Sequence, residues 1–389
     1  MVQNKGLIFK QIPQGVPVPG KDLVVETREF DLEQAPPPGG ITTKNFYASF
    51  DPYQRGRMRA AEAKSYSPAF PLGQPINNNT VAKVIKSDNP KFQPGDLLTG
   101  FIWTEEYSAL PKQLADGANK IENPYNLDVK HFLGALGMPG LTAYSSFYEI
   151  GKPVKGETIF ISSASGAVGA LVGQLAKHEG LKVIGSVGSD DKLKYIIDDL
   201  KFDGGFNYKT EKPADALKRL APNGVDIYYE NVGGEQLEAA INAMNDHGRI
   251  IACGMISEYS KAESERYPIK NLMSIVAKRI TMRGFIVGDA NMGPLHLKAR
   301  NENVAKWLAD GTFKATLSVT DGIDNGPEGF VGMLEGKNFG KAVLKIADIE
   351  NIPPFDPFEI SHFLICSCVN NMNIIHEVPT RGLVSFLLQ

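Results

Sequence analysis

The segment TIFISSASGAVGALVGQLAKHEG, residues 158–180, constrains the fold of this chain more than any other stretch. Its first five residues form a short apolar run that predicts a buried strand, and the glycines at 166 and 169 predict a tight turn. Apolar residues then recur three and four positions apart, as on one face of a helix. A glycine turn between a strand and a helix brings free backbone N–H groups close to a ligand, which favours a bound pyrophosphate. The turn reads ASGAVG rather than the fuller G-x-G-x-x-G, so a glycine-rich turn without a ligand stays an alternative.

The next apolar run, residues 181–187, predicts a parallel strand that completes a βαβ unit. Units that bind NAD usually carry an acidic residue at the end of this strand, where it holds the ribose 2′-hydroxyl. Here that position falls near Ser186 and Val187, which are uncharged. Ser189 is suited to cap a helix, and Lys192 follows within its first turn. This pattern favours the 2′-phosphate of NADPH over NADH, and a solvated helix lysine is the alternative for Lys192.

Composition excludes several classes of protein. The chain has 389 residues and a net charge of −3, which suits two domains and does not favour nucleic acid as a partner. Its three cysteines make no disulfide framework and fit a reducing compartment. The N-terminus has no apolar core of a signal peptide, and no run reaches the roughly 18 apolar residues of a membrane span. We therefore expect a cytoplasmic protein with no membrane partner.

Two different patterns of apolar residues along the sequence predict two domains. Residues 1–130 contain short alternating runs between proline- and glycine-rich turns, which predicts a small, partly open β-barrel. Residues 131–313 alternate helical stretches with apolar strands, as in a doubly wound parallel sheet. Barrel-like signals return at residues 314–350, so we expect the second domain to be inserted into the first, with a ligand cleft between them. The predicted strands are 6–11, 23–30, 45–49, 80–86, 96–103, 158–162, 182–187, 205–207, 225–230, 248–253, 280–287, 314–320 and 341–346, with a helix at 326–335.

Residues 351–389 do not match either of these two sequence patterns. They begin with prolines and continue with an apolar run that contains Cys366 and Cys368. Surface docking, association with another chain and a gene-model artefact all stay open. The two cysteines are interpreted as inert apolar residues, because C-x-C without a second pair is a weak metal motif.

Eight short segments together resemble one family. They are DPYQRGRM (51–58), GMPGLTAY (137–144), ASGAVG (164–169), GSDDK (188–192), FNYK (206–209), ENVGG (230–234), CGMISEY (253–259) and GKNFGK (336–341). In this order, over about residues 6–349, they resemble the zinc-free medium-chain dehydrogenase/reductase enzymes, most closely the NADPH-dependent alkenal or prostaglandin reductases. These are also described as leukotriene B4 12-hydroxydehydrogenase-like double-bond reductases. The resemblance implies a Rossmann-type domain (131–313) inserted into a GroES-like domain (1–130 and 314–350), and a homodimer.

The resemblance also implies where NADPH binds. The implied cofactor-binding residues are Gly166, Ala167, Val168, Gly169, Lys192, Tyr208, Asn231, Cys253, Gly254, Ile256, Ser257, Tyr259, Phe285, Ile286, Val287 and Asn338. Simpler alternatives exist for several of them. Tyr208 fits a surface aromatic, Asn231 a turn after a strand, and 285–287 a plain core strand. Asn338 also fits a loop residue in the left-handed conformation.

The zinc-dependent relatives of this family carry metal ligands that are missing here. They need a catalytic cysteine, a Gly-His-Glu near residues 70–80 and a structural cysteine cluster. Residues 72–76 read LGQPI, and the first cysteine of the chain is Cys253. A tetrahedral zinc site needs convergent Cys, His or carboxylate ligands, so we expect no metal.

Without a Lewis acid, conjugate reduction is more natural than reduction of a simple carbonyl. Hydride added to the β-carbon of an enal or enone drives negative charge onto the carbonyl oxygen, where a hydrogen-bond donor stabilises it. By resemblance Tyr259 is the first candidate donor. Tyr53 is the second, as a substrate-side donor or an aromatic wall, and Met138 is expected to line the same pocket. Each of the three also fits a purely structural role.

The sequence therefore predicts a double-bond reductase that uses NADPH. Alternatives within the superfamily are a quinone oxidoreductase, with a flatter acceptor pocket, and a biosynthetic trans-acting enoyl reductase. The non-enzymatic alternative is an NADPH-binding sensor or partner protein. The particular enal or enone is not encoded in any motif that we recognise.

Overall fold

The computed structural model describes residues 1–349, which form one compact unit. The expectations for residues 351–389, including those for Cys366 and Cys368, lie outside this part of the chain.

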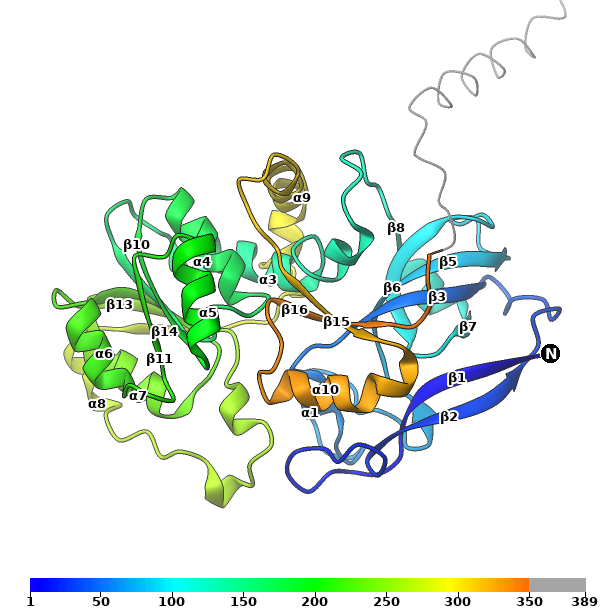
Figure 1. Ribbon diagram of the computed structural model, residues 1–389, viewed down its shortest axis with the longest axis horizontal. Helices are drawn as coiled ribbons and strands as arrows, with labels where there is room; N and C mark the ends of the chain where they lie inside the picture. The colour runs from blue at the N-terminus through cyan, green and yellow to red at the C-terminus, as the bar shows by residue number, and fades with distance from the viewer. Residues whose placement is uncertain (350–389) are drawn as a thin grey trace, which may run out of the picture. The chain divides into compact units, whose positions relative to one another are not determined.

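A six-stranded parallel sheet occupies the middle of the described chain (Figure 1). Its strands are β9 (Thr158–Ile161), β10 (Lys182–Val187), β11 (Gly204–Asn207), β12 (Val225–Glu230), β13 (Met244–Ala252) and β14 (Thr281–Gly284). The order β11-β10-β9-β12-β13-β14 is that of a dinucleotide-binding sheet, and every neighbouring pair is parallel. The strand order reverses between β9 and β12, so a ligand crevice is expected beyond the carboxyl ends of these strands.

Two boundaries in this sheet differ from the prediction by more than one residue. Strand β13 begins at Met244 rather than at residue 248. Strand β14 ends at Gly284, so Phe285–Val287 leave the sheet although their apolar character predicted a strand. Apolar residues extend a strand pattern equally well whether they pack in a sheet or line a cavity.

Helices cover both faces of the parallel sheet, which is why its strands are continuously apolar. Ile159 and Ile161 of β9 face a core built with α3 (Met138–Ser146), α4 (Gly169–His178) and α9 (Gly293–Ala309). Phe160, between them, faces the opposite core with α6 (Pro213–Leu220) and α7 (Gly234–Ala243). There its ring stacks on Tyr228 with centroids 4.9 Å apart.

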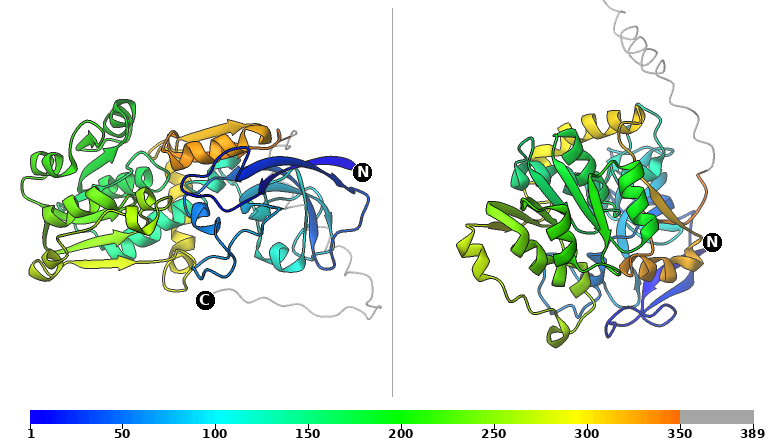
Figure 2. Two further views of the ribbon diagram at one scale, coloured as in Figure 1. Left: turned by 90° about the horizontal axis from the view of Figure 1, so that it is seen from below. Right: turned by 60° about the vertical axis from the view of Figure 1, so that its left-hand side comes forward.

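The remaining strands form two further sheets. One has the order β2-β1-β4, from β1 (Val2–Phe9), β2 (Leu23–Phe30) and β4 (Gln74–Pro75). The other has the order β15-β16-β3-β5-β6-β8, with β7 also paired to β3. Its strands are β3 (Ile41–Ser49), β5 (Asn77–Ser87), β6 (Leu97–Trp103), β7 (Tyr107–Leu110), β8 (Asn119–Lys120), β15 (Leu317–Asp321) and β16 (Lys341–Lys345). Strand β16 pairs with β3, almost 300 residues earlier, so the end of the described chain returns to its beginning (Figure 2).

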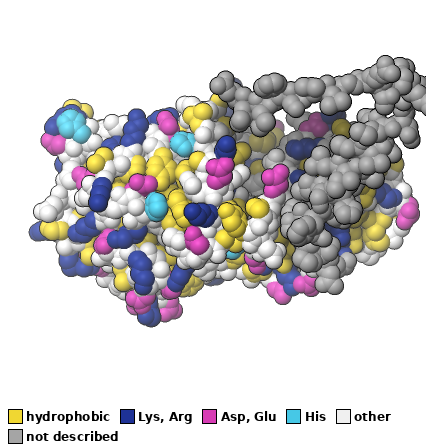
Figure 3. Space-filling view, turned by 90° about the horizontal axis from the view of Figure 1, so that it is seen from above, with side chains coloured by type: hydrophobic (Ala, Val, Ile, Leu, Met, Phe, Trp, Pro, Cys, Tyr) yellow, Lys and Arg dark blue, Asp and Glu magenta, His cyan; other side chains and the backbone are white. Residues whose placement is uncertain are grey.

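The fold class predicted from the sequence is confirmed, because a parallel Rossmann-type sheet interrupts a set of mainly antiparallel strands. The domain boundaries at 130 and 313 stay a prediction. The other helices are α1 (Gln54–Arg57), α2 (Lys112–Gly117), α5 (Asp190–Lys194), α8 (Met273–Ala277) and α10 (Gly326–Leu334). Within residues 1–349, no helix combines the length and the apolar character needed to cross a bilayer. On the face drawn in Figure 3, basic and acidic side chains are interspersed.

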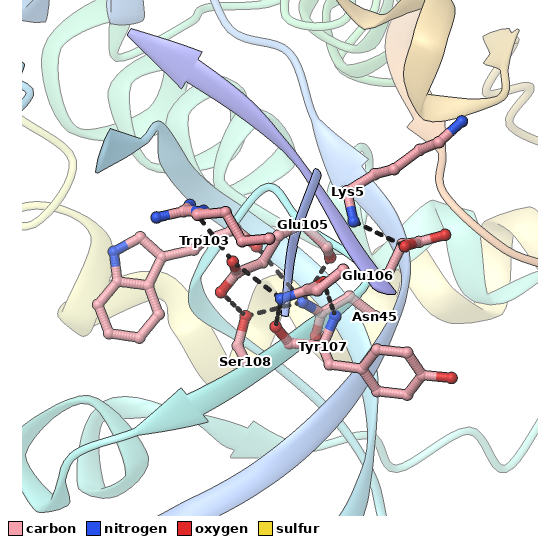
Figure 4. Close-up of polar contacts among 9 residues, drawn as sticks. Lys5, Asn45, Trp103, Glu105, Glu106, Tyr107 and Ser108 are labelled. Carbon is pink, nitrogen blue, oxygen red and sulfur yellow. Dashed lines mark hydrogen bonds and ion pairs between the residues drawn. The ribbon is translucent and has the colours of Figure 1, made fainter. Parts of the chain in front are cut away.

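A buried polar cluster ties the first strand to the turn between β6 and β7 (Figure 4). Glu105, only 9% exposed, accepts hydrogen bonds from Ser108 Oγ (2.8 Å) and from Asn4 Nδ2 (3.3 Å). Asn45 of β3 donates to the Glu105 carbonyl (2.8 Å) and to Ser108 Oγ (2.9 Å). Burial raises the pKa of the Glu105 carboxyl to about 7, against the lowering effect of these hydrogen bonds and of Arg28.

Candidate functional site

A cavity of about 590 Å³ is lined by loops that follow the parallel strands and by residues of the antiparallel part. Every cofactor-binding, substrate-binding and catalytic residue expected from the sequence lines this cavity. The structure thus brings together side chains from positions 53 to 338. Their individual roles stay predictions, and the geometry below shows what each group offers.

The glycine turn forms one wall of the cavity. After β9 the chain turns through Ser163, whose φ is +51°, and α4 begins at Gly169. A Cβ atom at Gly169 would lie 2.4 Å from the Ser163 carbonyl oxygen, so no side chain fits there. The turn is also held from outside, because Gly340 N–H donates to the Ser165 carbonyl (2.8 Å). Two of the four residues at 166–169 therefore lack a Cβ and the turn is fixed, as close approach to a pyrophosphate requires.

Two lysines and a tyrosine lie at the cavity wall beyond β10 and β11. Ser189 caps α5 by accepting from Lys192 N–H, as predicted. The Lys192 side chain is 8% exposed and donates to the Gly336 carbonyl (2.5 Å), so the alternative of a solvated lysine is wrong. Burial, and then the neighbouring charge of Lys209, lower the pKa of Lys192. Two cations near one phenol form a donor set that fits a phosphate group such as the 2′-phosphate of NADPH.

Space near these lysines is limited by Tyr208. A Cβ atom at Gly188 would lie 3.0 Å from the Tyr208 hydroxyl, so the glycine leaves room for that side chain. Tyr208 is 44% exposed and lines the cavity with its remaining surface. The surface-aromatic alternative and the binding role are therefore both compatible with its position.

The two candidate asparagines are both tied to backbone. Asn231 Nδ2 donates to the Ser162 carbonyl (2.7 Å), and its turn is shaped by buried Glu230, which accepts from the N–H groups of Val232 and Gly233. Asn338 Nδ2 donates to the Gly340 carbonyl (2.8 Å). Asn338 does not have a positive φ, so the left-handed alternative for it is wrong.

Tyr259 presents a phenol whose proton is uncommitted. It follows a short 3-10 turn, Ile256–Glu258, and its oxygen accepts a hydrogen bond from Met255 N–H (3.3 Å). An oxygen that accepts from the backbone keeps its own O–H to donate. Burial raises the pKa of Tyr259 to about 12, so this hydroxyl is protonated at neutral pH.

Tyr53 lies in the same cavity, but its proton is committed. Its hydroxyl donates to Asn78 Oδ1 at 2.7 Å. Asn78 is fully buried and donates in turn to Asp51 Oδ2 (2.8 Å). Asp51 pairs with Lys341, whose ammonium lies 2.5 Å from Asp51 Oδ1 and is 4% exposed. Burial lowers the pKa of Lys341, while the Asp51 carboxylate opposes this shift.

Several residues that line the cavity were not predicted from the sequence. Tyr66 lies close enough to Tyr53 and Tyr259 to act electrostatically on both. Lys209 lines the wall beside Tyr208, and Asp51 and Lys341 form the buried ion pair. Lys209, Asp51 and Lys341 lie inside the segments that carry the resemblance, which was a usable signal, whereas Tyr66 lies in an irregular stretch that carries none.

No group of three or more His, Cys, Asp or Glu side chains among residues 1–349 comes together in a way that could hold a metal ion.

Comparison with family models covers both parts of the fold. Residues 5–116 match a model described as the N-terminal domain of oxidoreductase, and residues 167–307 match one described as zinc-binding dehydrogenase.

Individual relatives span nearly the whole described chain. NADP-dependent oxidoreductase RED1 of Cochliobolus heterostrophus is 54% identical over 349 residues, covering 90% of this chain and 99% of the relative. The NADP(+)-dependent 2-alkenal reductase of Nicotiana tabacum is 41% identical, covering 89% and 98%. Among solved structures, CurA from Vibrio vulnificus in complex with NADPH aligns with a TM-score of 0.80 at 30% identity, covering 89% of this chain and all of that chain.

Proposed function

Because the chain belongs to the NADP-dependent oxidoreductases of the medium-chain dehydrogenase/reductase family, we propose that it reduces the conjugated C=C bond of α,β-unsaturated aldehydes or ketones with NADPH and without zinc. One observation carries the proposal. A single cavity joins the glycine turn and a lysine-tyrosine cluster to a protonated phenol whose O–H is free to donate.

The residues present fit the cofactor. The backbone at 166–169 would hold the pyrophosphate, and Lys192, Tyr208 and Lys209 would hold the 2′-phosphate. When bound, NADPH supplies a hydride to the β-carbon of the substrate, and the α-carbon then takes a proton from water to give the saturated carbonyl.

The chain's own contribution is electrostatic and positional. As the β-carbon is reduced, negative charge develops on the carbonyl oxygen. A hydrogen bond from the Tyr259 hydroxyl stabilises that charge more than it stabilises the neutral ground state, which lowers the barrier. The raised pKa of Tyr259 keeps this donor protonated throughout the neutral range.

The proposal is tested by following NADPH oxidation with a panel of enals and enones, a quinone and a saturated aldehyde, with NADH in parallel. We expect turnover of the enals and enones with NADPH, identified by mass spectrometry as the saturated carbonyl, and no loss of rate after treatment with a metal chelator. Turnover of the quinone alone would replace the proposal with the quinone oxidoreductase alternative. Tight NADPH binding without any turnover would favour the sensor role.

We also propose that the protein is a cytoplasmic homodimer. Strand β14 is the edge strand of the parallel sheet. The helix before it, α8, exposes Met273 (77%) and Val276 (70%), and Leu272 (54%) precedes that helix. An open sheet edge beside exposed apolar side chains is typical of a surface that pairs with a second copy.

A further inference from the structure

The hydrogen bonds behind Tyr53 fix which of its atoms can serve a ligand. Asn78 Nδ2 donates both to the Ser49 carbonyl (2.9 Å) and to Asp51 Oδ2 (2.8 Å). Both partners are acceptors, because one is a backbone carbonyl and the other is a carboxylate oxygen whose partner oxygen pairs with the Lys341 ammonium. A flipped Asn78 amide would set its oxygen against these two oxygens. The amide orientation is therefore determined, and Asn78 Oδ1 must face Tyr53.

It follows that the Tyr53 hydroxyl donates to Asn78 and has only lone pairs left for a ligand. The Arg57 guanidinium beside the phenol can take one of them. Arg57 is itself engaged elsewhere, because it donates to the carbonyls of Pro68 and Asn77 and lies 4.0 Å over the Phe70 ring. Because Tyr53 lines the cavity, we take the remaining lone pair of its oxygen as the one available to a ligand.

Tyr259 has the opposite polarity. Its oxygen accepts from Met255 N–H, and its proton is free. Of these two phenols in the cavity, Tyr53 can only accept and Tyr259 can donate, and Tyr66 lies close enough to act electrostatically on both. Both residues are tyrosines, so the neighbours of each hydroxyl group decide which one accepts and which one donates.

We propose that Tyr53 is a specificity-determining hydrogen-bond acceptor, so that the preferred substrates are enals or enones that carry an O–H or N–H donor in addition to the conjugated carbonyl. This inference rests on the proposed reductase function and departs from the expectation that Tyr53 donates. Asn78, backed by Asp51 and Lys341, is a positioning residue that sets this polarity.

The first experiment compares each hydroxylated enone with its methyl ether, which keeps the oxygen but lacks the donor. The wild-type enzyme should prefer the hydroxylated member in kcat/KM by roughly 3- to 10-fold, the range of one neutral hydrogen bond. Tyr53→Phe should bring this ratio to about one by slowing only the hydroxylated substrate. Tyr125→Phe removes the same hydroxyl from a 48% exposed tyrosine outside the cavity and should change neither rate.

The second experiment changes the polarity rather than the hydroxyl. Asn78→Leu frees the Tyr53 proton to donate to an ether oxygen, so kcat/KM for the methyl ether should rise while that for the hydroxylated enone is kept. A merely damaged site would lower both rates. Asn79→Leu makes the same change one residue further along β5, at a position that does not line the cavity, and should leave the ratio unchanged.

The outcomes separate the two proposals. If wild-type enzyme reduces no enone, the reductase function fails, and this inference falls with it. If enones are reduced but the hydroxyl preference is absent or survives in Tyr53→Phe, only the acceptor role is overturned. If Tyr53→Phe slows both members of each pair equally, the Tyr53 oxygen serves the cofactor or the packing of the wall instead.

Discussion

At the scale of single residues, the position of a proton distinguishes Tyr259 from Tyr53, because the Tyr53 hydroxyl donates to Asn78 and the Tyr259 hydroxyl keeps its proton free. We expect Tyr259→Phe to lower kcat on an enone by about 100-fold, the usual cost of removing one donor to a developing oxyanion. Stopped-flow measurement of the hydride-transfer step would show the loss directly, while NADPH affinity should stay within about twofold. Full kcat in this variant would contradict the donor role.

Lys192 offers a second prediction at this scale. Lys192→Gln should raise KM for NADPH by roughly 10- to 100-fold, the range for a hydrogen bond to a charged group, and should leave KM for NADH unchanged because NADH has no 2′-phosphate. Lys194 lies on the same helix with its side chain 77% exposed, so Lys194→Gln is the matched control. An equal loss for both cofactors would place Lys192 elsewhere in the binding mode.

The buried carboxyl of Glu105 makes the stability of the fold depend on pH. Its pKa is raised to about 7 in the folded protein from an ordinary value of 4.5. A raised pKa means that its favourable contribution is complete below pH 4.5 and is lost as the pH rises through 7. At about 1.4 kcal/mol per pKa unit, the loss amounts to about 3 kcal/mol of the free energy of unfolding.

We therefore expect Glu105→Gln to flatten this decline and to be more stable than the wild type at pH 8. Denaturant unfolding at pH 5 and pH 8 measures the difference, with the exposed Glu122→Gln as the control. An unchanged slope in Glu105→Gln would show that the carboxyl titrates normally.

Residue-scale features were only partly predictable from the sequence. Lys192 and Tyr259 could be named because each lies within a short segment with a recognisable pattern. The acceptor polarity of Tyr53 could not, because it depends on Asn78 and Lys341, which lie 25 and 288 residues away and meet it only in the folded chain. No local pattern records which way a buried amide points.

At the scale of elements, the longer strands were predictable because their apolar runs are bounded by glycine, proline and polar turns. Strands β2, β10 and β12 begin and end where the pattern does. The short strands β4, β7 and β8 were missed, since two to four residues carry too little alternation to be recognised. Phe285–Val287 show the converse error, in which an apolar pattern extends beyond the strand.

The edge strand β14 gives the prediction at this scale. If β14 and α8 form the dimer surface, Val276→Glu should convert the dimer to a monomer, because a carboxylate would be buried against apolar side chains. Light scattering coupled to size-exclusion chromatography measures the mass. Val154→Glu introduces the same charge at a valine that is 60% exposed in the loop before β9 and should leave the mass unchanged. A wild-type monomer would refute the pairing outright.

At the scale of the whole molecule, the order of sequence patterns along the chain was enough to predict the fold class. Parallel βα units and antiparallel hairpins have different patterns of apolar residues. A ligand cavity between the two predicted domains could be expected from the sequence, but its volume and its network of polar contacts could not.

The relatives that match about 90% of this chain are themselves covered almost completely, so about a tenth of this chain has no counterpart in them. We expect a chain ending at residue 350 to keep its melting temperature and its kcat. Thermal unfolding and steady-state kinetics of the two forms test this. A faster truncated enzyme would indicate that residues 351–389 restrict the cavity.

The backbone hydrogen bond from Gly340 to Ser165 means that the cavity is completed late in the synthesis of the chain. On the ribosome, all six strands of the parallel sheet are synthesised before residue 340. Gly340, which holds the glycine turn, and Lys341, which pairs with Asp51, are added later. A nascent chain that stalls before residue 340 therefore has the strands of its sheet but lacks the contacts that complete the cavity wall.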